Sequence, residues 1–287
     1  MMHSTGPFFC SRLAGAAPRL MAALTVTLAG CTSWPGDTSG TSRTTAPARE
    51  ASSALPWADP EDVGLTSADL RALAESVTQW VEAGRPVGAE LLIVKNGRTV
   101  MHEALGWRDR DNGHQLRPNS IYRIRSMTKP VIGTAVLMLA DENRVVLDDA
   151  VAEYLPSFAN DRSRAITIRQ LLTHTSGLGD HGVEDIGLPR RTDEYESLRS
   201  LVDDIGAIGP SRTQGAFHYS DSGTATLAAV VAEVSGMPVE RFLEIRIFEP
   251  LGMQDTHAQF SPDATWSDRV CSTYRWSGET LSFERYW

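Results

Sequence analysis

The chain contains the stretch Ile124-Arg125-Ser126-Met127-Thr128-Lys129-Pro130, in which a lysine follows a serine by three positions. Only two of the 27 Lys and Arg residues are lysines, Lys95 and Lys129, so arginine supplies almost every other cation. A desolvated lysine can give up its proton, whereas arginine cannot. Positions i and i+3 share one face of a helix. A helix that begins at Ser126 therefore places the amine of Lys129 beside a serine hydroxyl, as an activated nucleophile requires.

The S-x-x-K spacing has a second interpretation, because a serine at a helix N-terminus followed by a solvated lysine gives the same pattern. The other lysine, Lys95, stands beside Asn96-Gly97, a tight-turn sequence at which a solvated cation is expected. The rest of the chain must therefore distinguish a nucleophilic serine from an ordinary surface serine.

Composition excludes several classes of protein. The formal net charge is −9, so no basic surface for a nucleic-acid backbone is expected. Hydrophobic residues make up 41% of the chain and charged residues 22%, which is typical of a globular protein. The three cysteines do not make a disulfide framework. No H-E-x-x-H motif or paired-histidine zinc spacing occurs, so neither a metal nor a cofactor is predicted.

The N-terminal segment has the pattern of a bacterial lipoprotein signal. It has Arg12 and Arg19 and then an apolar run from Leu20 to Leu28 that is too short to span a membrane. The run ends in Leu28-Ala29-Gly30-Cys31, which resembles a bacterial lipobox. The resemblance implies cleavage before Cys31 and lipid attachment to its thiol. Ordinary secretory cleavage nearby, or a retained anchor, is the alternative.

These features predict a chain of three parts. Residues 1–30 are expected to form a lipoprotein signal peptide, and residues 31–56, rich in Ser, Thr, Ala, Gly and Pro, a flexible tether. Residues 57–287 are expected to form the folded domain. The protein is then secreted across the bacterial inner membrane and lipid-anchored at the cell envelope, on the periplasmic or cell-surface side.

Hydrophobic periodicity and turn residues predict an α+β domain. A helix over residues 67–83, capped by Thr66 or Ser67, precedes strands at 89–94 and 99–104, which Asn96-Gly97 joins as a hairpin. The other predicted elements are a short strand, four helices and two late strands, over residues 120–124, 126–142, 168–173 (capped by Thr167), 222–235 (capped by Ser222 and stopped by Gly236), 238–248, 270–276 and 280–283.

A tyrosine motif precedes one of the apolar helices, in the stretch Phe217-His218-Tyr219-Ser220-Asp221-Ser222-Gly223. Together with S-x-x-K it resembles the serine β-lactamase and penicillin-binding-protein superfamily, whose members carry S-x-x-K, then Y-x-N, then a K-T-G, H-x-G or W-x-G strand. The chain is most similar to the β-lactamase-related esterases of family VIII type and to class C-like hydrolases. Two more stretches carry the resemblance, Leu171-Leu172-Thr173-His174-Thr175-Ser176-Gly177-Leu178 and Ile247-Phe248-Glu249-Pro250-Leu251-Gly252-Met253.

The resemblance implies a β-lactamase/transpeptidase-like fold, an antiparallel sheet flanked by helices plus a mostly helical subdomain. It also implies that Ser126 attacks an acyl carbonyl and that Lys129 removes the serine proton, either as a neutral amine or sharing a proton with Tyr219. Tyr219 then returns a proton to the leaving group. The expected partner is a small acyl substrate, an ester or a β-lactam. Taken alone, Tyr219 also fits an ordinary core tyrosine before a helix.

Asp221 departs from the family pattern, in which the resemblance implies an asparagine that donates to the substrate amide oxygen. An ionised carboxylate only accepts, and burial beside Lys129 is expected to keep Asp221 ionised. A substrate-binding Asp221 therefore favours a carboxylesterase over a β-lactamase, with a D,D-peptidase third. His174 is expected to be a structural turn residue. No G-x-S-x-G motif occurs, which disfavours an α/β-hydrolase.

The third motif of the superfamily is not where the resemblance places it. Trp276-Ser277-Gly278 has the form W-x-G, but it follows Tyr219 too closely and is interpreted as a hairpin turn. The chain is therefore expected to be C-terminally truncated, without the last strands, the closing helix and one oxyanion N–H, and to leave an exposed sheet edge. The alternative function is a catalytically impaired or non-catalytic penicillin-binding-like protein.

Overall fold

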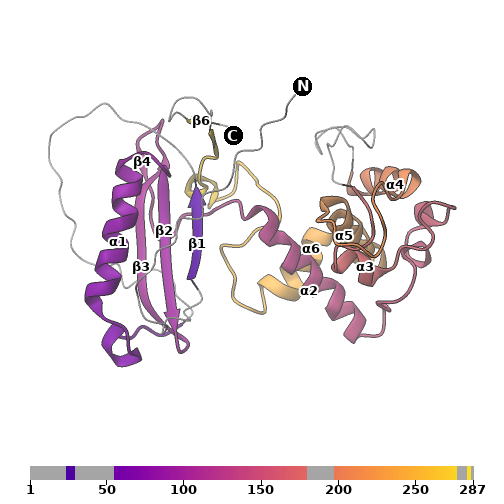
Figure 1. Cartoon of the computed structure of the whole chain (residues 1–287), viewed down its shortest axis with the longest axis horizontal. Coiled ribbons are helices and arrows are strands. Elements are labelled where there is room, and N and C mark those ends of the chain that lie inside the picture. The colour runs from indigo at the N-terminus through magenta and orange to yellow at the C-terminus, as the bar shows by residue number, and fades with distance from the viewer. Residues whose placement is uncertain (1–23, 30–54, 180–196, 277–282, 286–287) are drawn as a thin grey trace, which may run out of the picture. The chain divides into compact units, whose positions relative to one another are not determined.

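The computed structural model describes residues 24–29, 55–179, 197–276 and 283–285 (Figure 1). The chain divides into two compact units, one from residues 1–120 with 271–287 and one from residues 121–270. The first unit contains a four-stranded antiparallel sheet, and the described part of the second is built mainly of helices and turns. The predicted α+β fold class is therefore confirmed.

The sheet of the first unit has the strand order β1-β2-β3-β4. Its strands are Leu24–Ala29, Gly88–Lys95, Arg98–Asp109 and His114–Gln115. Asn96 and Gly97 join β2 to β3 with positive φ angles of 52° and 71°, the backbone that a two-residue hairpin turn of type I′ requires. The predicted hairpin is confirmed, and β3 extends beyond the predicted strand.

Helix α1, Ser67–Glu82, lies along this sheet (Figure 1). Its N-cap is Thr66, whose side chain accepts a hydrogen bond from the Asp69 N–H, as one of the two predicted caps. A 3-10 helix, Pro60–Val63, precedes it. Helix and sheet share a core because apolar residues recur at helical spacing in α1 and at every second position in β2. This core includes Leu70, Val77, Ala89, Leu91, Ile93 and Met101.

In the full chain the edge of β2 is paired by a strand that cleavage before Cys31 would remove, so the open edge stays a prediction for the cleaved protein. Strand β1, from the segment predicted to be a signal peptide, pairs antiparallel with β2 from Leu24–Ile93 to Ala29–Gly88. An apolar strand there supplies partners to backbone groups that an open edge would leave exposed. Residues 1–23 and 30–54, which include the rest of the predicted signal peptide, Cys31 and most of the predicted tether, lie outside the described residues.

The last strands are β5, Tyr274–Trp276, and β6, Phe283–Arg285, which pair antiparallel. The strand predicted at 270–276 is therefore too long, and of the strand predicted at 280–283 only Phe283 is described, as the first residue of β6. Trp276 belongs to β5, whereas Ser277 and Gly278 of the predicted turn lie outside the described residues.

The second unit is organised around helix α5. Its α-helices are α2 (Thr128–Asp141), α3 (Ile168–Leu172), α4 (Leu198–Ile208), α5 (Asp221–Ser235) and α6 (Val239–Leu243), which continues as a π-helical turn, Glu244–Phe248. Short 3-10 helices lie at Arg125–Met127, Val151–Glu153, Pro156–Phe158 and Ser267–Arg269. Helix α5 contacts α2, α3, α4 and α6. Within the described ranges, no helix is long and apolar enough to cross a membrane.

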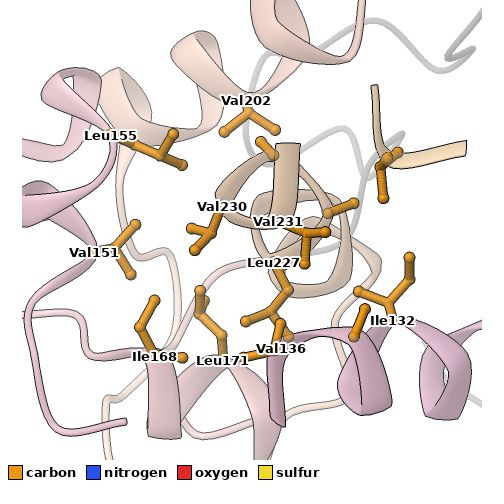
Figure 2. Close-up of a cluster of buried hydrophobic side chains, with 14 of the residues drawn as sticks. Ile132, Val136, Val151, Leu155, Ile168, Leu171, Val202, Leu227, Val230 and Val231 are labelled. Atoms are coloured by element: carbon orange, nitrogen blue, oxygen red, sulfur yellow. The ribbon is translucent and has the colours of Figure 1, made fainter. Parts of the chain in front are cut away.

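Figure 2 shows the core of this unit, where side chains of α5 meet those of its neighbours. Leu227, Val230 and Val231 of α5 are at most 4% exposed. Ile132 and Val136 of α2 are likewise buried in this cluster. A helix that is apolar on most of its faces belongs in such a central position. This core fixes the N-terminal ends of α2 and α5, where the predicted site residues lie.

Three local predictions for this unit are wrong. Residues 120–124 form no strand, because only Ile121 makes a bridge, to Val270. Ser126 lies in the 3-10 turn that precedes α2 rather than in the α-helix itself. The cap of α5 is Ser220, which has extended backbone angles and accepts from the Gly223 N–H, whereas Ser222 is already helical and its hydroxyl donates to the Gly179 carbonyl.

Candidate active site

Ser126 sits on a tight turn at the head of α2. The 3-10 turn Arg125–Met127 runs directly into the helix, and Ser126 itself is exposed. Arg125, the residue before it, has φ of 50°, a region that L-residues other than Asn and Asp rarely occupy. The apolar face of α2 is buried, with Ala135 and Val136 both 0% exposed. The buried helix thus anchors the turn from which the exposed Ser126 projects.

Lys129 stands beside this hydroxyl. Its Nζ donates a hydrogen bond of 3.3 Å to Ser126 Oγ, as the S-x-x-K spacing predicts. The lysine side chain is only 14% exposed. The amine is therefore partly withdrawn from water and is held by protein groups.

Tyr219 reaches the same place from the start of α5. The Lys129 ammonium lies 4.4 Å from the centre of the tyrosine ring. Lys129 and Ser126 are also the two residues that lower the pKa of the Tyr219 phenol. The structure thus brings Ser126, Lys129 and Tyr219 together.

His174 holds Tyr219 in position. Its ring stacks on the tyrosine ring with centres 4.8 Å apart, and its Nδ1 accepts a 3.2 Å hydrogen bond from the Ser220 N–H. The His174 carbonyl accepts from the His218 N–H at 2.8 Å. His174 has φ of 57°, so its backbone turns sharply here. The structural role predicted for His174 agrees with these contacts, but its direct contact with Tyr219 was not predicted.

Asp221 completes the cluster as the first residue of α5. Its carboxylate forms an ion pair with the Lys129 ammonium. A negative charge at a helix N-terminus is also favoured by the helix dipole. Burial of Asp221 was expected, yet its side chain is 60% exposed, because the helix end faces solvent.

The surroundings of Lys129 favour its protonated form, whereas the sequence hypothesis gave a neutral amine or a proton shared with Tyr219. Burial of the ammonium lowers the pKa of Lys129, but its hydrogen bonds to Asp221 and Tyr219 outweigh burial, so the pKa lies above the usual lysine value. A lysine that keeps its proton at neutral pH is a hydrogen-bond donor and a cation. In this arrangement the Lys129 proton is harder to remove than that of an ordinary lysine.

Tyr219 shows the opposite shift. Hydrogen bonds to Lys129 and then to Ser126 lower the pKa of the Tyr219 phenol below its usual value, against a smaller effect of desolvation. The nearby cation stabilises the phenolate. The phenol is therefore the group in this cluster whose proton is made easier to remove.

No group of three or more His, Cys, Asp or Glu side chains suited to a metal occurs in the part of the chain that the structure describes. The predicted lipid-attachment residue, Cys31, lies outside that part and is not placed relative to the cluster. The candidate site consequently consists of Ser126, Lys129, Tyr219 and Asp221, with His174 supporting the tyrosine.

Comparison with known proteins identifies the family. The family model described as Beta-lactamase matches residues 73–284, so the chain belongs to this family. The chain is 38% identical over 169 residues to "Putative penicillin-binding protein PbpX" of Bacillus subtilis, covering 59% of this chain and 40% of that protein. It is 32% identical over 214 residues to the esterase EstB of Burkholderia gladioli, covering 69% and 54%.

Solved structures have the same fold. The crystal structure of FmtA from Staphylococcus aureus superimposes with a TM-score of 0.64 at 24% identity, over 81% of this chain and 61% of that one. The chain spans about half the length of the curated relatives named above.

Proposed function

We propose that this protein is a serine hydrolase that forms an acyl-enzyme on Ser126, with esters preferred over β-lactams. The observation that carries the proposal is the 3.3 Å hydrogen bond from Lys129 Nζ to Ser126 Oγ, beside the Tyr219 ring, whose centre lies 4.4 Å from that Nζ. A nucleophile next to an oriented base is the arrangement that covalent acyl transfer requires. The relationship to the esterase EstB supports this reaction class.

The proposed reaction begins with Tyr219 as a phenolate stabilised by the Lys129 cation. The phenolate takes the Ser126 proton while Oγ attacks the acyl carbonyl carbon. The resulting Tyr219 phenol then gives its proton to the leaving alcohol as the carbon–oxygen bond breaks, which leaves the acyl group on Ser126. Water hydrolyses this ester by the same proton transfers, releasing the acid and restoring the serine.

The turn that carries Ser126 also suits the developing negative charge. The first backbone N–H groups of a helical segment have no acceptor within that segment. Ser126 lies within the 3-10 turn Arg125–Met127 at the head of α2. Its backbone N–H is therefore proposed as an oxyanion donor, and removal of one such donor in enzymes costs roughly 100- to 1,000-fold in rate.

The preference for esters rests on Asp221. A carboxylate at the mouth of the cluster accepts hydrogen bonds but does not donate to the amide oxygen of a β-lactam side chain. Simple esters lack that amide, so the missing donor does not weaken their binding. Asp221 forms an ion pair with Lys129, yet its side chain is 60% exposed, so the carboxylate is accessible to an incoming substrate.

The experiment that tests the proposal is hydrolysis of short p-nitrophenyl esters by the 287-residue chain. We expect turnover by the wild-type protein and loss of all but background rate in Ser126→Ala. The matched control is Ser76→Ala, which removes an exposed serine hydroxyl from α1. Equal rates in Ser126→Ala and the wild type would contradict the proposal.

The second candidate function is penicillin binding without efficient turnover, favoured by the 38% identity to PbpX. The two functions differ in how fast the acyl-enzyme is hydrolysed. Intact-mass measurements after mixing with benzylpenicillin separate them. A covalent adduct that persists for hours, together with no ester turnover, supports the binding protein. Ester turnover without a persistent adduct supports the hydrolase.

We also propose a lipid anchor at Cys31, on the basis of the Leu28-Ala29-Gly30-Cys31 sequence. Metabolic labelling with a clickable fatty acid should mark the protein in a bacterial host, and Cys31→Ser should abolish the mark. Unlabelled wild-type protein in the soluble fraction would contradict the anchor.

A further inference from the structure

Arg125 occupies a backbone conformation that favours a smaller residue. Its φ of 50° lies in the left-handed region, which glycine adopts without steric cost. Strained residues persist where the surrounding structure fixes them, and they cluster at functional sites. Arg125 directly precedes the candidate nucleophile, so its long cationic side chain starts from the same turn as Ser126.

A cavity of about 390 Å³ lies next to this residue, wholly within the second unit. Arg125 and Thr128 both line it, and they bracket Ser126 in the chain. Consecutive Cα atoms are about 3.8 Å apart, so the cavity adjoins the turn that carries the nucleophile. The cavity thus lies beside the turn that carries Ser126, although Ser126 is not one of its lining residues.

One side of the cavity is aromatic. His257 stacks on Trp266 with ring centres 3.9 Å apart and planes 6° from parallel, and Phe260 meets Trp266 edge to face at 6.0 Å. All three residues line the cavity, and Phe260 is 55% exposed. Such rings offer apolar surface for a hydrocarbon or aromatic group.

The lining of the cavity contains basic side chains although the protein as a whole is acidic. Its lining includes Arg123 and Arg125 but no carboxylate, whereas the whole chain has a formal charge of −9. Within the described residues, Arg125 makes no ion pair. The nearby Arg269, by contrast, is paired with Asp255. A guanidinium is well suited to binding a carboxylate through two parallel hydrogen bonds.

We propose that this cavity binds the acyl part of the substrate and that Arg125 pairs with a carboxylate on it. The inference rests on the proposed function, since it assigns a substrate class to the same serine. The preferred substrates are esters whose acyl group has an apolar or aromatic body and a carboxylate. Arg125 is then a specificity-determining residue whose charge selects the substrate.

Two esters of equal chain length test the proposal, p-nitrophenyl valerate and the mono-p-nitrophenyl ester of glutaric acid. They differ only in a terminal carboxylate. The readout is the ratio of kcat/KM for the anionic ester to that for the neutral ester. Arg125→Gln should lower this ratio about tenfold, and Arg125→Lys should keep most of it. The control Arg98→Gln removes one exposed cation at the start of β3 and should leave the ratio unchanged.

An unchanged ratio in Arg125→Gln, or an equal fall in Arg98→Gln, overturns the assignment while ester turnover itself still stands. A binding measurement separates this failure from failure of the proposed function. By calorimetry, 4-phenylbutyrate should bind the wild-type chain at least tenfold more tightly than 4-phenylbutyramide, and Arg125→Gln should remove the difference. That result without ester turnover keeps the cavity assignment and rejects the hydrolase. Equal affinities for the acid and the amide reject the cavity assignment.

Discussion

The Lys129 ammonium is paired with the carboxylate of Asp221, although the two residues lie 92 positions apart in the chain. The pair joins the N-terminal ends of α2 and α5, which the apolar core of the second unit holds together. It stabilises the protonated lysine. We therefore propose Tyr219 as the proton acceptor of the cluster, and this assignment can be tested.

The role of Lys129 as a cation predicts that Lys129→Arg is more active than Lys129→Met. Arginine keeps the positive charge that stabilises the phenolate, whereas methionine keeps only the length of the side chain. We expect Lys129→Met to lose roughly 100- to 10,000-fold in kcat/KM on a p-nitrophenyl ester, the range typical of general acid–base groups. Lys129→Arg should be at least about tenfold better than Met. If both variants are equally inactive, release of the lysine proton is required instead.

The pH dependence of kcat/KM follows from the shifted pKa values of Tyr219 and Lys129. Activity requires deprotonated Tyr219 and protonated Lys129, so kcat/KM should rise as the phenol ionises and fall as the lysine loses its proton. The rise lies below the usual tyrosine pKa of about 10, and the fall lies above the usual lysine pKa of about 10.4. A stopped-flow pH profile on a base-stable substrate checks this. Activity that rises at the lysine pKa with no later fall would indicate Lys129 as the base.

Asp221→Asn should move both limbs of this profile to lower pH. The Asp221 carboxylate raises the pKa of Lys129 by its hydrogen bond and charge, and its charge also raises the pKa of Tyr219. Removing that charge therefore lowers both values. Asp203→Asn on α4 is the control, because it removes a carboxylate that pairs with Arg199 away from the cluster. If the pH profile of Asp221→Asn matches that of the wild type, Asp221 does not control the protonation of Lys129 and Tyr219.

The same substitution should change substrate preference. Asparagine can donate to the amide oxygen of a β-lactam side chain, which the carboxylate does not. The rate on a cephalosporin should therefore rise relative to the rate on a p-nitrophenyl ester, and both are followed by absorbance. A ratio that is flat or falls would remove the structural basis for preferring esters.

Two buried or partly buried glycines give a matched pair of stability predictions. A Cβ at Gly206 of α4 would lie 2.7 Å from the Phe158 ring and 2.9 Å from the Ser157 carbonyl, so Gly206→Ala should destabilise the fold by about 1–3 kcal/mol. A Cβ at Gly133 of α2 meets only Leu172, at 3.7 Å. Gly133→Ala should therefore stabilise by about 0.5–1 kcal/mol through helix propensity. Urea unfolding measures both, and a loss of stability in both variants would argue against the packing described here.

Sequence reasoning found the hairpin, α1 and the spacing of Ser126 and Lys129 because each depends on local patterns, whereas only the family resemblance joined Tyr219 to them. Asn96-Gly97 selects a turn by its own backbone preference, and S-x-x-K places two side chains within one helical turn. The pairing of Lys129 with Asp221 and the stacking of His174 on Tyr219 depend on how distant segments pack. Their effect on pKa could not be predicted without the geometry. Likewise, the strand expected at 120–124 has suitable residues, but among the described residues it makes only a single bridge, from Ile121 to Val270.

The most direct test of the account is identification of the residue that a fluorophosphonate probe modifies. Trypsin cleaves after Arg125, so the modified peptide should begin at Ser126 and carry a single probe mass on that serine. Tyr219→Phe should slow the modification without moving it, and Ser126→Ala should remain unmodified. A probe found on another serine, or equal modification of wild type and Ser126→Ala, would contradict Ser126 as the nucleophile.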